Sequence, residues 1–263
     1  MPVINYPHRL LRGVVLLMLA VCLSSCATPV RRPTMPSTSA TALPGLAGPI
    51  EGPRHDIFHV VGPGETLWRI GRMYDVQVRD IMEANKMTSR YPVLRKGERL
   101  LVPKAASVKP VISLYPSQRW RYIIVHHSAT DEGDSLLFDA AHRSKGWDGV
   151  GYHFIIDNGS KGRSDGQVEV SPRWLKQLPG AHCKADGMNE VAIGICLVGN
   201  FNQELPSRQQ MEALVDLVNK LRLYYHIPDS NILGHGQVRG AQTDCPGKHF
   251  PWIEFRRRLS LKK

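Results

Sequence analysis

Residues 191–198, Val-Ala-Ile-Gly-Ile-Cys-Leu-Val, form a nearly uninterrupted apolar run. A strand without polar alternation is buried on both faces, as the inner strands of a sheet are when helices cover it. Further strands are expected at 121–125 and 151–157, and the apolar residues of 207–225 recur at helical spacing. Strands interleaved with helices predict an α/β fold in which a mixed central β-sheet is flanked by helices.

The first 25 residues have the pattern of an export signal. Positive residues precede the apolar run 13–23, which is shorter than the about 20 residues of a membrane-spanning helix. Residues 23–26, Leu-Ser-Ser-Cys, resemble the lipobox of bacterial lipoproteins. That resemblance implies removal of residues 1–25, a lipid anchor on Cys26 and, because Ala27 follows, an outer-membrane location facing the periplasm. The alternative is an ordinary signal peptide with a chance cysteine.

The formal net charge of +11 raises the question of an anionic partner. Export argues against nucleic acid, and no basic patch is interleaved with aromatic residues of the kind that stack on bases. Phosphate headgroups and the acidic polymer of a cell wall are the better candidates. We therefore expect no nucleic-acid partner.

Composition divides the rest of the chain. Residues 26–56 are rich in Pro, Ser, Thr, Ala and Gly, which predicts a flexible tether. Residues 57–104 have the pattern of a compact unit in the order strand, helix, helix, strand. A shorter linker at 105–117 leads to a larger domain at 118–263.

The compact unit contains three stretches, Val-Val-Gly-Pro-Gly-Glu-Thr-Leu-Trp, Ile-Met-Glu-Ala-Asn and Leu-Arg-Lys-Gly-Glu-Arg-Leu. In this order they resemble a LysM module, a small βααβ domain that binds glycans containing N-acetylglucosamine, such as peptidoglycan. The resemblance implies the glycan strand of peptidoglycan as a partner. We expect Trp68 to pack and Asn85 to form a turn, rather than to contact sugar. A single copy predicts modest affinity.

The cysteines bear on the chemistry of the larger domain. Of the five in the chain, Cys22 leaves with the signal and Cys26 takes the lipid, so that Cys183, Cys196 and Cys245 remain. An odd number cannot all pair within one molecule, and free thiols are a liability outside the cytoplasm. At least one cysteine therefore has another role, while a disulfide between Cys183 and Cys196 stays open.

Several histidines lie at expected strand ends or in Gly-rich turns, at positions 126, 127, 153, 182 and 235. Successive side chains of a strand point to opposite faces, so one of His126 and His127 is a site candidate and the other packs. His235 and Cys245 frame a loop short enough for both to reach one ion. Imidazole nitrogen and thiolate sulfur are ligands that zinc prefers, and a catalytic site leaves its fourth position to water.

Five blocks follow one another between residues 122 and 252. They are Tyr-Ile-Ile-Val-His-His-Ser-Ala-Thr, Trp-Asp-Gly-Val-Gly-Tyr-His-Phe, Pro-Gly-Ala-His-Cys, Asn-Glu-Val-Ala-Ile-Gly-Ile-Cys and Gly-His-Gly-Gln-Val-Arg-Gly-Ala-Gln-Thr-Asp-Cys-Pro-Gly. In this order they resemble the type-2 N-acetylmuramoyl-L-alanine amidases, which include phage amidase-lysozymes and peptidoglycan recognition proteins. The resemblance implies a zinc amidase that cuts the amide between N-acetylmuramic acid and L-alanine. It places Zn²⁺ on His126, His235 and Cys245, and leaves His127 to pack.

The same resemblance implies the catalytic groups. Phage-type members use the tyrosine of the Gly-Tyr-His-Phe block, here Tyr152, and many members have Lys or Thr two places before the last ligand, here Thr243. The structural alternatives are a buried strand aromatic and a turn residue. Some members have a catalytic glutamate where this chain has Cys196, so the tyrosine mechanism is favoured. His182 and Asn189 are candidates to line the substrate groove.

Two other functions compete with a membrane-tethered, LysM-targeted amidase. A non-catalytic peptidoglycan receptor could use the same fold, although receptor-type relatives commonly lose the cysteine ligand that this chain keeps as Cys245. A structural lipoprotein that links the outer membrane to the wall would not depend on that cysteine. The zinc amidase is the leading hypothesis.

Overall fold

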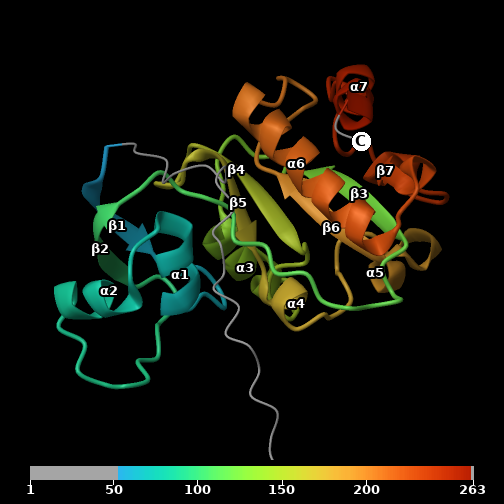
Figure 1. Ribbon diagram of the computed structural model, residues 1–263. Coiled ribbons are helices and arrows are strands. Elements are labelled where there is room, and N and C mark those ends of the chain that lie inside the picture. The colour runs from blue at the N-terminus through green and yellow to red at the C-terminus, as the bar shows by residue number, and fades with distance from the viewer. Residues whose placement is uncertain (1–52, 262–263) are drawn as a thin grey trace, which may run out of the picture. The chain divides into compact units, whose positions relative to one another are not determined.

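The computed structural model describes residues 53–261 (Figure 1). The expected signal segment, the lipidated Cys26 and most of the expected tether lie outside the described residues. Across residues 53–261, no helix combines the length and the apolar character that crossing a membrane requires.

The N-terminal module has the expected order of strand, helix, helix and strand. Its elements are β1 (His55–Val60), α1 (Leu67–Tyr74), α2 (Val78–Ala84) and β2 (Arg99–Ala105). The two strands pair antiparallel. Thr66 caps α1, because its hydroxyl accepts a hydrogen bond from Arg69 N. Ile70 and Ile81, one from each helix, are fully buried in the core of the module.

Two residues of this module test the sequence expectations. Asn85 forms a turn, because its side-chain amide donates to the Ile81 and Leu101 carbonyls and its Oδ1 accepts from Leu101 N. The expectation that Trp68 packs is wrong, since this residue is 57% exposed. Leu67 and Ile70 take the inward positions of α1, and helical spacing then turns Trp68 to solvent.

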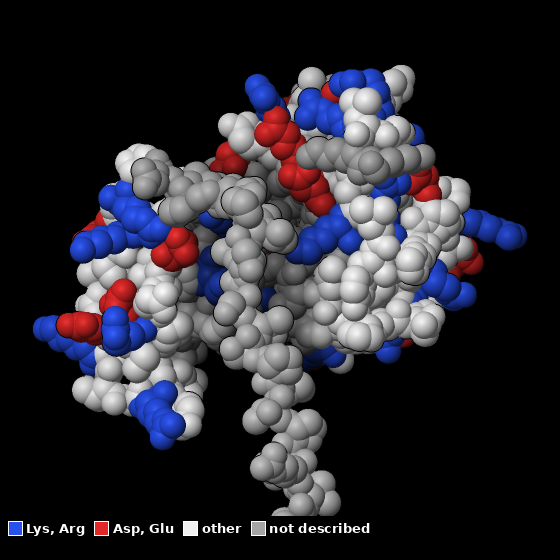
Figure 2. All heavy atoms as spheres, in the orientation of Figure 1, with Lys and Arg blue, Asp and Glu red and all other residues white. Residues whose placement is uncertain are grey.

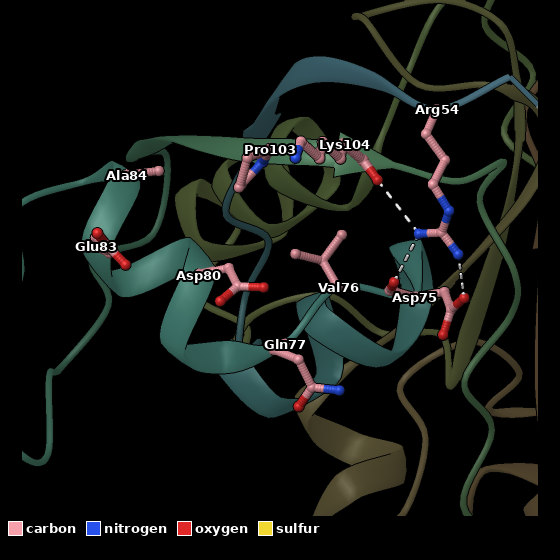
Figure 3. Close-up of a pocket in the computed structure, with 9 residues that line it drawn as sticks. All are labelled: Arg54, Asp75, Val76, Gln77, Asp80, Glu83, Ala84, Pro103 and Lys104. Carbon is pink, nitrogen blue, oxygen red and sulfur yellow. Dashed lines mark hydrogen bonds and ion pairs between the residues drawn. The ribbon is translucent and has the colours of Figure 1, made fainter.

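A hollow of about 470 Å³ lies on the same module and is drawn in Figure 3. Arg54 reaches over it and donates to the Asp75 carboxylate at 2.6 Å and to the Lys104 carbonyl at 3.3 Å. Asp80 and Glu83 of α2 also line it. Its lining includes no histidine or cysteine, so it does not provide the metal ligands that the sequence predicts.

The larger domain is built on one five-stranded sheet with the strand order β5-β4-β6-β3-β7. Its strands are β3 (Tyr122–His127), β4 (Phe154–Asn158), β5 (Asp165–Val170), β6 (Ala192–Leu197) and β7 (Ile232–Gly234). β4, β6, β3 and β7 run parallel, whereas β5 pairs antiparallel with β4. The mixed central sheet that the sequence predicts is confirmed.

Two helices, α6 (Arg208–Tyr225) and α7 (Trp252–Leu261), contribute to the main core on one face of this sheet. In Figure 1, α6 lies across the strands. A capping box starts α6, because Ser207 Oγ accepts from Gln210 N while the Gln210 side chain accepts from Ser207 N. The buried stripe of α6, which includes Leu214 and Val218, packs on the sheet.

The opposite face of the sheet carries the candidate site. The remaining helical segments are α3 (Ser135–Ser144), α4 (Pro172–Leu175), α5 (Met188–Val191) and the short turns η1 (Ala185–Gly187), η2 (Asp229–Asn231) and η3 (His235–Gln237). Phe138 of α3 packs with Ile155 on this face. Side chains alternate along β3, so Ile123 and Val125 join the α6 core while Ile124 faces the other way.

Candidate metal centre

Three side chains with metal-binding atoms converge at one edge of the sheet. His126 lies in β3, His235 directly follows β7, and Cys245 lies in the loop beyond. Their nearest ligand atoms all lie within 4.8 Å of one another, and Cys245 Sγ is 3.6 Å from His126 Nδ1. The structure thus brings together the three residues that the sequence predicts as ligands.

Strand pairing explains why the two histidines meet. β3 and β7 are parallel neighbours, and Val125 is paired with Gly234. The next residue of each chain segment is His126 in one and His235 in the other, and their ring centroids are 4.7 Å apart. The carboxyl ends of two parallel strands therefore present both imidazoles at the same edge.

A tight loop returns Cys245 to these histidines. Gly236 N donates to the Cys245 carbonyl at 2.7 Å, and a Cβ at Gly236 would lie only 2.3 Å from the Thr243 carbonyl oxygen. His127 N donates to Cys245 Sγ at 3.4 Å. The loop can close in this way because residue 236 has no side chain.

The protonation states suit a metal ion. Burial, with a smaller effect from His182, holds the pKa of His126 well below its usual value, and burial also lowers the pKa of His235. Both imidazoles are therefore neutral at pH 7, which is the form that binds metal. Burial raises the pKa of the Cys245 thiol to about 12, so a cation must displace its proton. Two nitrogens and one sulfur fit Zn²⁺.

The choice between the two adjacent histidines follows from strand alternation. His126 is 1% exposed and points to the site face, whereas His127 points the other way and packs its ring on Phe201. His127 Nδ1 accepts a hydrogen bond from Phe201 N at 3.0 Å. His127 thus has a packing contact, as the sequence predicts.

Tyr152 lies against His126, one of the three candidate ligands. Its ring centroid is 5.3 Å from that of His126, and the Cys196 side chain is its neighbour. Cys196 is the register partner of His126 on β6, so these two side chains share a face. Burial, followed by the neighbouring Cys196, raises the pKa of Tyr152 well above its usual value. The phenol is therefore a hydrogen-bond donor at neutral pH.

Thr243 is exposed and lies two residues before Cys245. Its hydroxyl oxygen accepts a hydrogen bond from Cys245 N at 3.1 Å, which shapes the loop. This contact is the turn role that the sequence leaves open. A catalytic role for Thr243 stays a prediction.

His182 and Asn189 are hydrogen-bonded to each other, and His182 also contacts His126. His182 is 8% exposed, and its Nδ1 is 3.0 Å from His126 Nε2. Asn189 Oδ1 accepts hydrogen bonds from His182 N and Cys183 N, each at 2.8 Å. The structure therefore gives both residues contacts within the protein, and a contact of either with substrate stays a prediction.

The cysteines in the described part of the chain are all free thiols, and Cys183, Cys196 and Cys245 are all buried. The open pairing of Cys183 with Cys196 is thus not formed here. The contacts of Tyr152 with Cys196 and of His126 with His182 join residues far apart in the sequence. In the sequence, these contacts are indicated only in that each of the four residues lies in one of the five blocks that resemble the amidase family.

In Figure 2, Lys and Arg side chains stand among Asp and Glu over the face shown. The absence of a nucleic-acid partner stays a prediction.

Comparison with known proteins defines the family. The Amidase_2 model, described as N-acetylmuramoyl-L-alanine amidase, matches residues 116–248, more than half of the 263-residue chain. A LysM domain model matches residues 59–103. The chain belongs to the Amidase_2 family of N-acetylmuramoyl-L-alanine amidases and carries a LysM domain.

Several individual proteins are similar to this chain. An N-acetylmuramoyl-L-alanine amidase of Sus scrofa is 34% identical over 48% of this chain and 21% of its own length. A peptidoglycan-recognition protein of Drosophila simulans is 32% identical over 51% of this chain and 71% of its own length. A solved N-acetylmuramoyl-L-alanine amidase from Clostridium intestinale is 33% identical, with a TM-score of 0.46 over 58% of this chain and 95% of that one. The chain spans less than two thirds of the length of the first curated relatives that it matches.

Proposed function

We propose that the protein is a zinc-dependent amidase that hydrolyses the amide between N-acetylmuramic acid and L-alanine in peptidoglycan. The observation that carries this proposal is the convergence of His126, His235 and Cys245 within 4.8 Å in a chain of this family. Three protein ligands leave one tetrahedral position to water, as in catalytic rather than structural zinc sites.

A bound Zn²⁺ supplies Lewis-acid polarisation of the amide carbonyl and activates water at neutral pH. His126 and His235 offer neutral nitrogens to the ion because burial disfavours their protonation. Tyr152 keeps its proton and donates a hydrogen bond to the negative charge that develops on the carbonyl oxygen. Cys196, the register partner of His126, lies beside Tyr152 on the site face of the sheet. Thr243 is a second candidate donor.

We further propose that the LysM module directs the enzyme to the glycan strand and that a lipid on Cys26 anchors it to the outer membrane, facing the periplasm. The match of residues 59–103 to LysM and the Leu-Ser-Ser-Cys pattern at 23–26 support these two steps. Membrane fractionation of the full chain and of Cys26→Ala tests the anchor. Loss of membrane association is expected for the variant, and equal association would contradict the proposal.

The activity is tested with a defined muramyl peptide. Zinc-loaded protein should release a peptide that begins with L-alanine, identified by mass, while metal content is measured on the same sample. Cys245→Ala should lose both metal and product. His249→Ala is the matched control, since His249 is exposed in the same region of the chain but outside the ligand group. Product formation by metal-free Cys245→Ala would refute a zinc amidase.

The relatives named peptidoglycan-recognition proteins favour one alternative, a receptor that binds peptidoglycan without cutting it. In the same assay this alternative predicts that zinc-loaded protein retains the muramyl peptide and releases no product. Calorimetric binding of the peptide without any change in its mass would therefore replace the amidase proposal by the receptor.

A further inference from the structure

The imidazole of His126 has a partner on the side away from the other ligands. His126 Nε2 lies 3.0 Å from His182 Nδ1, and His182 Nε2 lies 3.3 Å from the Ala192 carbonyl oxygen. Both rings are buried. The contacts therefore run in one line, from the backbone of β6 through His182 to His126 and on to Cys245 Sγ, 3.6 Å from His126 Nδ1.

The end of this line fixes the position of each proton. A backbone carbonyl oxygen can only accept, so His182 Nε2 must carry a hydrogen. A neutral imidazole has one N–H, which leaves His182 Nδ1 as an acceptor. His126 Nε2 then donates to it, and His126 Nδ1 is left with a free lone pair. That lone pair is on the nitrogen beside Cys245, where a metal ion would lie.

The ring of His182 is held in place from two sides. A Cβ at Gly180 or at Gly194 would lie 2.3 Å from His182 Cδ2, so glycine at both positions gives the ring its space. His182 N donates a hydrogen bond to Asn189 Oδ1, which fixes the backbone at His182. Gly194 belongs to β6, the strand that also supplies the Ala192 carbonyl. The acceptor nitrogen of His182 thus has one position relative to His126.

We propose that His182 is a positioning residue that fixes the tautomer and the ring orientation of His126, so that Nδ1 of His126 binds the metal ion. This inference rests on the proposed zinc site, but it does not require the protein to cut its substrate. Hydrogen bonds from metal-binding histidines to a further acceptor typically change metal affinity about 10- to 100-fold when they are removed.

Two substitutions at His182 separate positioning from packing. His182→Leu replaces the imidazole by an apolar side chain of similar size and so removes the acceptor. His182→Asn places an amide oxygen near the position of Nδ1 and so keeps the acceptor. The Zn²⁺ dissociation constant, measured by competition with a chromogenic chelator, should rise about 10- to 100-fold in His182→Leu and by less than about tenfold in His182→Asn. A Zn²⁺ dissociation constant in His182→Leu equal to that of the unsubstituted protein would overturn the proposal.

Two spectroscopic measurements remain informative if a variant folds poorly. Nitrogen-15 NMR of the unsubstituted metal-free protein should show His126 as the Nε2–H tautomer, and an Nδ1–H tautomer would overturn the inference. In Co²⁺-substituted protein, the ligand-field spectrum should change in His182→Leu and return toward the original in His182→Asn. A protein that shows these effects but does not release product would keep the inference and lose the amidase proposal.

Discussion

Replacement of Tyr152 by Phe removes one oxygen atom from the site and leaves the ring in place. The Tyr152 side chain is partly buried beside Cys196, and its ring packs against His126, one of the three candidate ligands. If it stabilises the charge that develops on the substrate carbonyl oxygen, its loss should lower kcat about 10²- to 10³-fold, which corresponds to about 2.7–4 kcal/mol. KM for a muramyl peptide should change little, because the donor acts mainly in the transition state.

The structural effect of the same substitution should be much smaller. The side chain beside the hydroxyl is Cys196, whose sulfur is at most a weak hydrogen-bonding group, so the free energy of unfolding should fall by about 1 kcal/mol or less. Zinc affinity should be unchanged, since none of the three ligands is altered. The rate should therefore fall about 10²- to 10³-fold, whereas the folding equilibrium constant should fall only about fivefold or less.

The assay is steady-state release of product from a defined muramyl peptide, with zinc content and thermal unfolding measured on the same preparations. Tyr225→Phe is the matched control: its hydroxyl donates to the Tyr115 carbonyl at 2.9 Å, away from the metal centre, so it should lose about 1 kcal/mol of stability and keep full activity. A Tyr152→Phe enzyme with kcat within about threefold of the original would refute the role given to the hydroxyl.

Three further predictions concern the metal, a buried carboxyl and the ligand loop. Removal of Zn²⁺ by a chelator should lower the melting temperature, and free Zn²⁺ at 100 times its dissociation constant should restore about 2.7 kcal/mol. Burial, followed by the charge of Glu169, raises the pKa of Asp157 well above its usual value, so the folded state binds this proton more tightly than the unfolded state and stability falls as pH rises from about 4. The melting temperature should therefore fall less between pH 5 and 8 in Asp157→Asn than in the unsubstituted protein. An equal fall in both proteins would contradict the raised pKa of Asp157. Gly236→Ala should weaken Zn²⁺ binding at least about tenfold, because the added Cβ would lie 2.3 Å from the Thr243 carbonyl oxygen. The Zn²⁺ affinity is measured by chelator competition, and an unchanged affinity would show that the loop adapts to the added methyl group.

The long helix and the inner strands could be predicted because their signals are local. The apolar stripe of 207–225 and the capping pair Ser207 and Gln210 define α6 closely, since cap and stripe lie within the same segment. The strand expected at 151–157 instead begins at Phe154. Gly151 accepts from Ala181 N and His153 N donates to Gly194, so the preceding residues bond to distant backbone that no local pattern reveals.

A family resemblance in the sequence predicts the three metal ligands. It does not predict the contacts that hold these ligands in place. Strand alternation alone shows that His126 and His127 face opposite ways, but the choice between them requires knowing which face α6 covers. The bond from His182 to His126 depends on glycines at 180 and 194, whose effect appears only when the chain is folded. Trp68 shows the converse error, because it is expected to pack and is instead 57% exposed.

The metal ligands do not share one kind of support. His126 and His235 follow paired positions of neighbouring strands, whose spacing the sheet's hydrogen bonds fix at about 4.8 Å. Cys245 is carried by a loop that closes on itself through Gly236. Ions of different radius should therefore be accommodated mainly by displacement of the sulfur, with both imidazoles nearly stationary. Selectivity among divalent cations would then depend on how far the backbone around residue 245 can move.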